Sequence, residues 1–192
     1  MREITFDIET ANTLPALSRS DLSQLELSIV GIHDSETGEY SSYTKEELPL
    51  LWPIMERADV LIGFNSDYFD IPILNRYYPG DLSKIRSLDL LVEVQKVLGR
   101  RIRLQSLAEA TLNKGKGGDG LKAVEWWQKG EVEKVREYCI EDVRITRQIY
   151  EYAIENNALK YKDLKQTREM KIDASSWRLS GEGTSLTHTL PL

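Results

Sequence analysis

The chain has 192 residues, of which 41% are hydrophobic and 29% are charged, and its formal net charge is −6 at pH 7. This composition is typical of a water-soluble globular protein and not of a disordered chain. No apolar run approaches the roughly 20 residues that cross a bilayer, so we expect a cytoplasmic protein without a membrane partner.

The single cysteine, Cys139, cannot form an internal disulfide, and it forms no zinc-type cluster with the only histidines, His33 and His188. The negative net charge argues only weakly against nucleic acid, because an enzyme that holds metal ions collects acids at a site where the ions reverse the local field. The composition therefore leaves metal-dependent chemistry on nucleic acid open.

The length fits one domain with a short extension. We expect a main domain over residues 1–157, a C-terminal hairpin of the same domain over residues 158–178, and a flexible tail over residues 179–192. No internal repeat or second domain boundary is evident.

The order of the expected elements predicts an α/β fold, with helices packed on the faces of a mixed sheet. A first strand begins at about residue 3, and LELSIVGIHD and YSSYT form a hairpin beside it. KEELPLLWPIMERA has helical spacing interrupted by two prolines, DVLIGFN is a short buried strand, and FDIPILNRYY is a short helix. After a short strand at KIRSLD, we expect helices over residues 89–98, 104–112, 121–128 and 131–155.

The first strand carries two acids in the stretch ITFDIET. With the strand period of two, Ile4, Phe6 and Ile8 face one way, whereas Asp7 and Glu9 share the other face. On its own this alternation also fits a half-buried strand with one solvated face.

The last helix carries an acid on its apolar face. That face consists of Val132, Val135, Cys139, Asp142, Thr146, Ile149 and Ala153. A buried carboxylate needs a metal ion or a buried base as its partner, unless this part of the helix faces solvent instead. Tyr138 lies one turn before Asp142 on the same side.

A further acid, Asp70, follows the buried strand in GFNSDYFDIPIL. An aspartate at the start of a helix with Pro72 in its first turn is also a good N-cap, and both roles are compatible.

The segments FDIET, GFNSDYFD and YCIED, in this order, resemble the three exonuclease motifs of the DnaQ-like superfamily. Within that superfamily, the closest resemblance is to the exonuclease domain of family B DNA polymerases and its stand-alone prokaryotic relatives. The resemblance covers about residues 1–155. It implies a ribonuclease H-like fold, in which the first three strands are antiparallel, the later ones are parallel, and helices flank the sheet.

The resemblance also implies the roles of the site residues. Asp7, Glu9, Asp70 and Asp142 are the implied metal ligands and catalytic acids. Tyr138 occupies the position of the water-orienting residue in the tyrosine branch (DEDDy), whereas the histidine branch requires a histidine where this chain has Glu137. The implied substrate-binding residues, which contact the terminal nucleotide, are Asn65 and Phe69.

The chemistry expected from this resemblance is 3′-to-5′ exonucleolytic hydrolysis with two divalent cations, Mg²⁺ or Mn²⁺. The expected substrate is nucleic acid with a free 3′ end, DNA rather than RNA and preferably single-stranded, and a replication or repair protein is a possible partner. The alternatives are a structure-specific or RNA-directed nuclease of the same fold, or a non-catalytic binding subunit of a replication or repair assembly.

One basic cluster stays outside these motifs. Lys96, Arg100, Arg101 and Arg103 lie together in KVLGRRIR. The sequence fits a solvated helix end and a ligand-binding site equally well.

Overall fold

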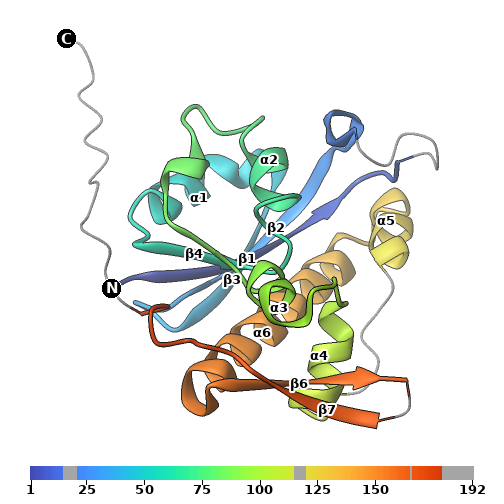
Figure 1. Cartoon of the computed structure of the whole chain (residues 1–192). Helices are drawn as coiled ribbons and strands as arrows, with labels where there is room; N and C mark the ends of the chain where they lie inside the picture. The colour runs from blue at the N-terminus through green and yellow to red at the C-terminus, as the bar shows by residue number, and fades with distance from the viewer. Residues whose placement is uncertain (15–20, 115–119, 165, 179–192) are drawn as a thin grey trace.

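The protein is described here by a computed structural model that covers residues 1–14, 21–114, 120–164 and 166–178; the flexible tail predicted for residues 179–192 lies outside these ranges. Its centre is a five-stranded sheet (Figure 1). The strands of this sheet are β1 (Glu3–Thr10), β2 (Leu27–Asp34), β3 (Glu39–Thr44), β4 (Val60–Gly63) and β5 (Ser87–Asp89).

The strand order in the sheet is β3-β2-β1-β4-β5. The β1–β2 and β2–β3 pairs are antiparallel, whereas the β1–β4 and β4–β5 pairs are parallel. The predicted mixed sheet, antiparallel in its first three strands and parallel afterwards, is thus confirmed. The first strand lies in the centre of this sheet, which makes it a rigid support for side chains.

Helices cover both faces of the sheet (Figure 1). They are α1 (Leu48–Met55), α2 (Asp70–Leu74), α3 (Leu90–Leu98), α4 (Leu104–Thr111), α5 (Gly120–Gln128) and α6 (Val132–Asn156), with short 3-10 turns at Leu22–Gln24, Lys45–Glu47 and Leu82–Lys84. The helices α1 and α2 lie on one side, and α3, α4 and α6 lie on the other.

The alternation of β1 decides which side each of its residues faces. Ile4, Phe6 and Ile8 are buried in one core cluster with residues of α1 and α2. The other face of β1, which carries Glu3, Asp7 and Glu9, is directed toward α6. Glu3 and Glu9 are buried on this side and Asp7 is half-buried, so the acids of the first strand do not form a fully solvated face.

The two strands that follow α6, β6 (Ala158–Asp163) and β7 (Gln166–Lys171), form a separate antiparallel pair. Residues of this hairpin and of the segment after it, among them Leu159, Met170 and Ile172, are buried in the same core cluster as α4 and α6. The hairpin thus packs on the main core instead of forming a core of its own.

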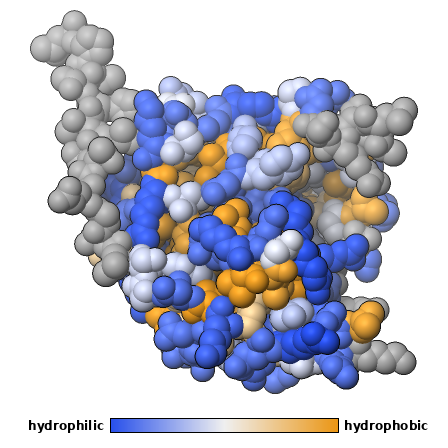
Figure 2. Space-filling model, viewed as in Figure 1, coloured by the Kyte–Doolittle hydropathy of each residue, from blue (hydrophilic) through white to orange (hydrophobic). Residues whose placement is uncertain are grey.

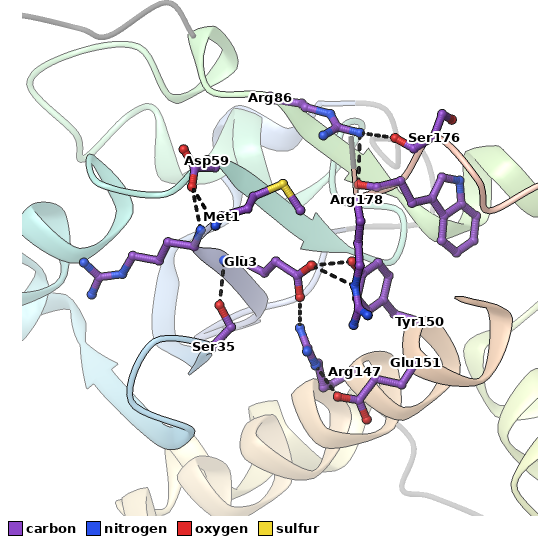
Figure 3. Close-up of polar contacts among 12 residues, drawn as sticks. Met1, Glu3, Ser35, Asp59, Arg86, Arg147, Tyr150, Glu151, Ser176 and Arg178 are labelled. Atoms are coloured by element: carbon purple, nitrogen blue, oxygen red, sulfur yellow. Dashed lines mark hydrogen bonds and ion pairs between the residues drawn. The ribbon is translucent and has the colours of Figure 1, made fainter. Parts of the chain in front are cut away.

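The segment that ends at Arg178 is held against the start of β1 by a buried polar cluster (Figure 3). Glu3 accepts hydrogen bonds from Arg147 and from the hydroxyl of Tyr150, both at 2.6 Å, and pairs with Arg178 at 3.4 Å. The ring of Trp177 stacks on that of Tyr150 with their centroids 6.0 Å apart. This cluster joins the end of the described chain to its beginning.

Hydrophilic residues cover most of the face in Figure 2, and hydrophobic ones reach the surface in small patches. Such scattered patches are normal for a folded protein. Within the described residues, no helix has both the length and the hydropathy that crossing a membrane requires.

Candidate active site

The candidate site begins on β1, where Asp7 and Glu9 point toward α6. The thiol of Cys139, on α6, donates a weak hydrogen bond to the backbone oxygen of Asp7 at 3.5 Å, and its sulfur lies 3.9 Å from Asp7 Oδ2. One possible ligand atom from each of Asp7, Glu9 and Cys139 lies within 4.8 Å of the others. The strand and the helix are therefore in direct contact at the acids.

This close approach depends on Gly31, which pairs with Asp7 across the β1–β2 ladder. A Cβ atom at Gly31 would lie 2.9 Å from Cys139 Sγ and 3.1 Å from Val143 Cγ2. Only a residue without a side chain lets α6 pack so closely on the sheet at this point.

The third acid is placed by the sharp turn after β4. Gly63 ends the strand with no room for a side chain, because a Cβ there would lie 2.4 Å from Ser66. Asn65 has a φ of 66°, a conformation that asparagine tolerates better than most residues. The turn carries the chain into α2, whose first residue is Asp70.

Asp70 is buried, and its Oδ1 accepts a hydrogen bond from the backbone N–H of Ile8 at 3.1 Å. It is the first residue of α2 rather than its N-cap, which is Phe69. Asp70 therefore does not serve only as a helix cap, because its carboxylate is hydrogen-bonded to the strand that carries Asp7 and Glu9.

The fourth acid, Asp142, projects from α6 next to Tyr138, whose side chain is hydrogen-bonded to it. The ring of Tyr138 packs edge-on against Trp126 of α5, with the centroids 6.1 Å apart. The aromatic contact fixes the ring, so the hydroxyl stays beside the acids.

The four carboxylates of the site have too little positive charge around them to offset their own negative charge. Burial raises the pKa of Asp7 well above its usual range, and the charges of Asp70, Asp142 and Glu9 raise it further. Burial and the charges of Asp142 and Asp70 do the same to the pKa of Glu9. Burial raises the pKa of Asp70 to about 8 and that of Asp142 to about 6, although hydrogen bonds to Ile8 and Tyr138 oppose these shifts.

The same face of β1 carries a contrasting acid. Glu3 is buried, as Glu9 is, and burial alone would raise its pKa, but hydrogen bonds from Tyr150 and Arg147 of α6 outweigh this effect, so that its pKa is lowered. Near Asp7 and Glu9 the same helix supplies Asp142, another acid. One helix thus neutralises the first acid of the strand and adds negative charge to the others, as expected where the missing charge comes from a bound cation.

The donor set fits hard divalent cations. Asp7, Glu9, Asp70 and Asp142 offer carboxylate oxygens, which Mg²⁺ and Mn²⁺ prefer. Cys139 is a soft donor whose pKa is raised far above its usual range by burial and then by Asp7, so it stays a neutral thiol in contact with Asp7. This acidic cluster is where the structure allows metal ions to bind, although their identity and number stay predictions.

The two substrate-binding residues predicted from the sequence lie in different surroundings. Asn65 is half-buried and accepts a hydrogen bond from Arg101 through its side-chain oxygen. Phe69 packs against the core cluster of α1 and α2. Phe64, in contrast, lines a surface hollow together with Asp7 and Asn65. A substrate-binding role for Asn65 and Phe69 stays a prediction.

Three residues important to this geometry were not predicted. Gly31 sets the distance between helix and sheet, and Arg101 contacts Asn65. Asp89, at the end of β5, is buried and accepts hydrogen bonds from the backbone N–H groups of Asn65 at 2.7 Å and Asp67 at 3.1 Å. For Arg101 the signal was the basic cluster KVLGRRIR, and for Asp89 it was an aspartate at the start of a helix, since Asp89 is also the N-cap of α3.

A mixed five-stranded sheet that brings four acids together beneath a long helix defines an α/β protein with an acid-centred site. The sequence matches the RNase H superfamily over residues 4–154. The chain belongs to the RNase H superfamily, and this membership supports a nuclease.

Among solved structures, the chain is similar to the family B DNA polymerase from the hyperthermophilic archaeon Pyrobaculum calidifontis, with a TM-score of 0.60 and 17% sequence identity. The similarity covers 80% of this chain and 24% of the polymerase chain, so the chain spans about a quarter of that protein's length. At this level of identity the likeness shows a shared fold. No curated protein sequence matches the chain significantly.

Proposed function

We propose that this protein is a metal-dependent 3′-to-5′ exonuclease that hydrolyses phosphodiester bonds at the 3′ ends of nucleic acid. The observation that carries the proposal is the convergence of Asp7, Glu9, Asp70 and Asp142, all with raised pKa values and beside a tyrosine hydroxyl. Carboxylates that destabilise one another are kept together where a function needs them. The substrate is single-stranded, and DNA rather than RNA.

The four carboxylates would hold two divalent cations, Mg²⁺ or Mn²⁺. The chemistry that such ions would supply there is a lower pKa of a bound water molecule and compensation of the charge that develops on the phosphate. Asp7 and Glu9, on one central strand, already offer carboxylate oxygens within 4.8 Å of each other.

Tyr138 orients the attacking water and does not serve as its base. Burial and the neighbouring charges of Asp142, Glu9 and Asp7 raise the pKa of the phenol, so it is protonated at neutral pH. Its hydroxyl is held by Asp142 and can make one more hydrogen bond, to water. Tyr138→Phe therefore removes the hydroxyl that orients the water but leaves the acids in place.

The reaction forms a bond between the water oxygen and phosphorus and breaks the bond between phosphorus and the 3′ oxygen of the preceding nucleotide. The 3′ oxygen receives a proton, and the terminal unit leaves as a nucleoside 5′-monophosphate. Asn65 and Phe69 position that terminal nucleotide.

The proposal is tested with matched single-stranded DNA and RNA oligomers that carry a label at the 5′ end. With Mn²⁺ or Mg²⁺ we expect a ladder that shortens one nucleotide at a time, faster on DNA, and no ladder with chelator. Asp7→Asn and Asp142→Asn should each abolish it. Glu133→Gln, an exposed acid on the same helix α6, is the matched control and should leave the rate unchanged.

Other outcomes identify the alternatives. Cleavage of a circular single strand indicates an endonuclease, and faster shortening of RNA indicates an RNA-directed enzyme. If the wild type binds oligomers but never shortens them with either ion, the chain is a non-catalytic subunit. A partner in replication or repair and a cytoplasmic location stay predictions.

A further inference from the structure

The basic cluster in KVLGRRIR lies beside the acidic site. A surface hollow of about 850 Å³ includes Asp7 and Asn65 in its lining and extends to Lys162 on β6. Arg100, Arg101 and Arg103 line the same hollow. We call this surface, defined by the three arginines and Lys162, the basic hollow.

The local backbone explains why the arginines point outward. Gly99 ends α3 with a φ of 69°, a turn that favours glycine, and Arg103 is extended before α4 begins. In this short connection Ile102 packs against the core cluster, while Arg101 and Arg103 on either side of it are exposed. The alternation thus anchors the segment by its isoleucine and leaves the cations at the surface.

These cations are only partly neutralised. The side chain of Arg100 is 53% exposed, with its closest carboxylate oxygen, on Asp163, 3.7 Å away. Lys162 donates its hydrogen bond to the neutral hydroxyl of Thr167. The side chain of Arg103 has neither an ion pair nor a hydrogen bond to any other residue in the described ranges. Among the described residues, Glu109 is the one acid in the lining besides Asp7.

The rest of the lining combines two polar residues, Gln105 and Ser106, with the apolar side chains of Phe64, Leu91, Ile102 and Leu104. A surface that combines an aromatic side chain, aliphatic groups and cations matches a single nucleic-acid strand, whose bases stack and whose phosphates are charged. The chain as a whole has a net charge of −6, but the basic hollow gathers positive charge. It therefore offers a polyanion a favourable approach to the acids.

We propose that the basic hollow binds the phosphate backbone of the strand that leads away from the scissile bond, with Arg100, Arg103 and Lys162 as phosphate-binding residues. This inference rests on the proposed exonuclease function and adds to it the path of the substrate. Arg101 joins the two sites because it also donates to Asn65. The enzyme consequently favours substrates several nucleotides long over a single nucleotide unit.

The test compares two substrates, a single-stranded 12-mer and the p-nitrophenyl ester of thymidine 5′-monophosphate, which is too short to reach along the hollow. The triple variant Arg100→Ala, Arg103→Ala, Lys162→Ala should lower the ratio of kcat/KM for the 12-mer to kcat/KM for the ester at least tenfold. The control triple variant Lys45→Ala, Arg57→Ala, Lys84→Ala removes three exposed cations outside the lining and should leave this ratio unchanged.

Salt dependence supplies a second readout. Each phosphate contact on a single strand adds about 0.7 to the slope of log affinity against log salt concentration, so losing three cations should reduce that slope by about 2. The slope is measured by fluorescence anisotropy with a labelled 12-mer and the inert Asp7→Asn protein, with and without the triple substitution.

The outcomes separate the two claims. If the wild type hydrolyses both substrates and the triple variant keeps the ratio and the slope, the hollow is not a phosphate site and the exonuclease stands. If the wild type hydrolyses neither substrate, the proposed function fails. The anisotropy measurement still decides about the hollow, because unchanged affinity and slope in the triple variant overturn it whatever the activity.

Discussion

At the scale of single residues, the site depends on two acids that face the same way on one strand but have opposite partners. Glu3 is neutralised by Arg147, whereas Asp7 meets further carboxylates. The fold can supply a cation to this face of the strand, as Arg147 shows at Glu3. The lack of a cation around Asp7 is therefore a property of the sequence. Its cost to the stability of the fold can be measured.

Without metal ions, the acidic cluster should destabilise the fold at neutral pH. Burial and the neighbouring acids raise the pKa of Asp7, which opposes folding at neutral pH, so in chelator Asp7→Asn should have a higher melting temperature than the wild type. Mn²⁺ at 100 times its Kd should raise the free energy of unfolding of the wild type by about 2.7 kcal/mol, and with it the melting temperature. It should have little effect on the variant. Equal responses of the two proteins to Mn²⁺ would contradict a metal site at Asp7.

Gly31 should be intolerant of any side chain. Gly31→Ala places a Cβ 2.9 Å from Cys139 Sγ, which we expect to cost about 1–3 kcal/mol and to shift α6 away from Asp7, with a loss of activity. Adding Cys139→Ala removes the sulfur and should recover part of the stability, although Val143 remains close. Urea unfolding of the two single variants and the double variant measures this coupling, and strict additivity would show that the contact is not the cause.

At the scale of elements, the order of strands and helices was predictable because hydrophobic periodicity is local. The expected face of the last helix is correct for Val135, Cys139, Thr146, Ile149 and Ala153, which are buried in α6. Arg147 and Tyr150 are buried as well, which spacing could not predict, because a polar residue is buried only if a distant partner such as Glu3 exists. Asp89 and Gly31 escaped prediction for the same reason, since their roles depend on contacts between elements.

The contact between α6 and the start of β1 should be sensitive to acid. The pKa of Glu3 is lowered below its usual 4.5, so its stabilising contribution is complete above about pH 4.5 and is lost as the pH falls through the folded-state value. Glu3→Gln should therefore be less stable than the wild type at pH 7 and lose less stability on acidification. Melting temperatures between pH 7 and pH 3 test this, with exposed Glu155→Gln on α6 as the control.

At the scale of the whole molecule, residues of the hairpin β6–β7 and of the segment up to Arg178 are buried in the same core cluster as α4 and α6. That residues 158–178 extend the same domain stays a prediction. Trp177 is 2% exposed and stacks on Tyr150, and Arg86 donates to its backbone oxygen at 3.0 Å. These contacts link the sheet, the long helix and the end of the described chain.

Truncation after Asn157 should therefore expose the core around Tyr150 and prevent stable folding. Trp177→Ala, a milder change, should cost about 3–5 kcal/mol, as is typical of a buried tryptophan. Circular dichroism and urea unfolding measure both effects. A truncated protein that melts at the wild-type temperature would show that residues 158–178 form a separate extension.

The most direct test of the central claim is to identify the first product released from an oligomer that carries its label in the 3′-terminal nucleotide. With Mn²⁺, we predict that the label appears at once as a nucleoside 5′-monophosphate, while Asp7→Asn and the chelated wild type release none. Release of the label in a longer fragment, or an intact oligomer after prolonged incubation, would contradict a 3′-to-5′ exonuclease at this acidic site.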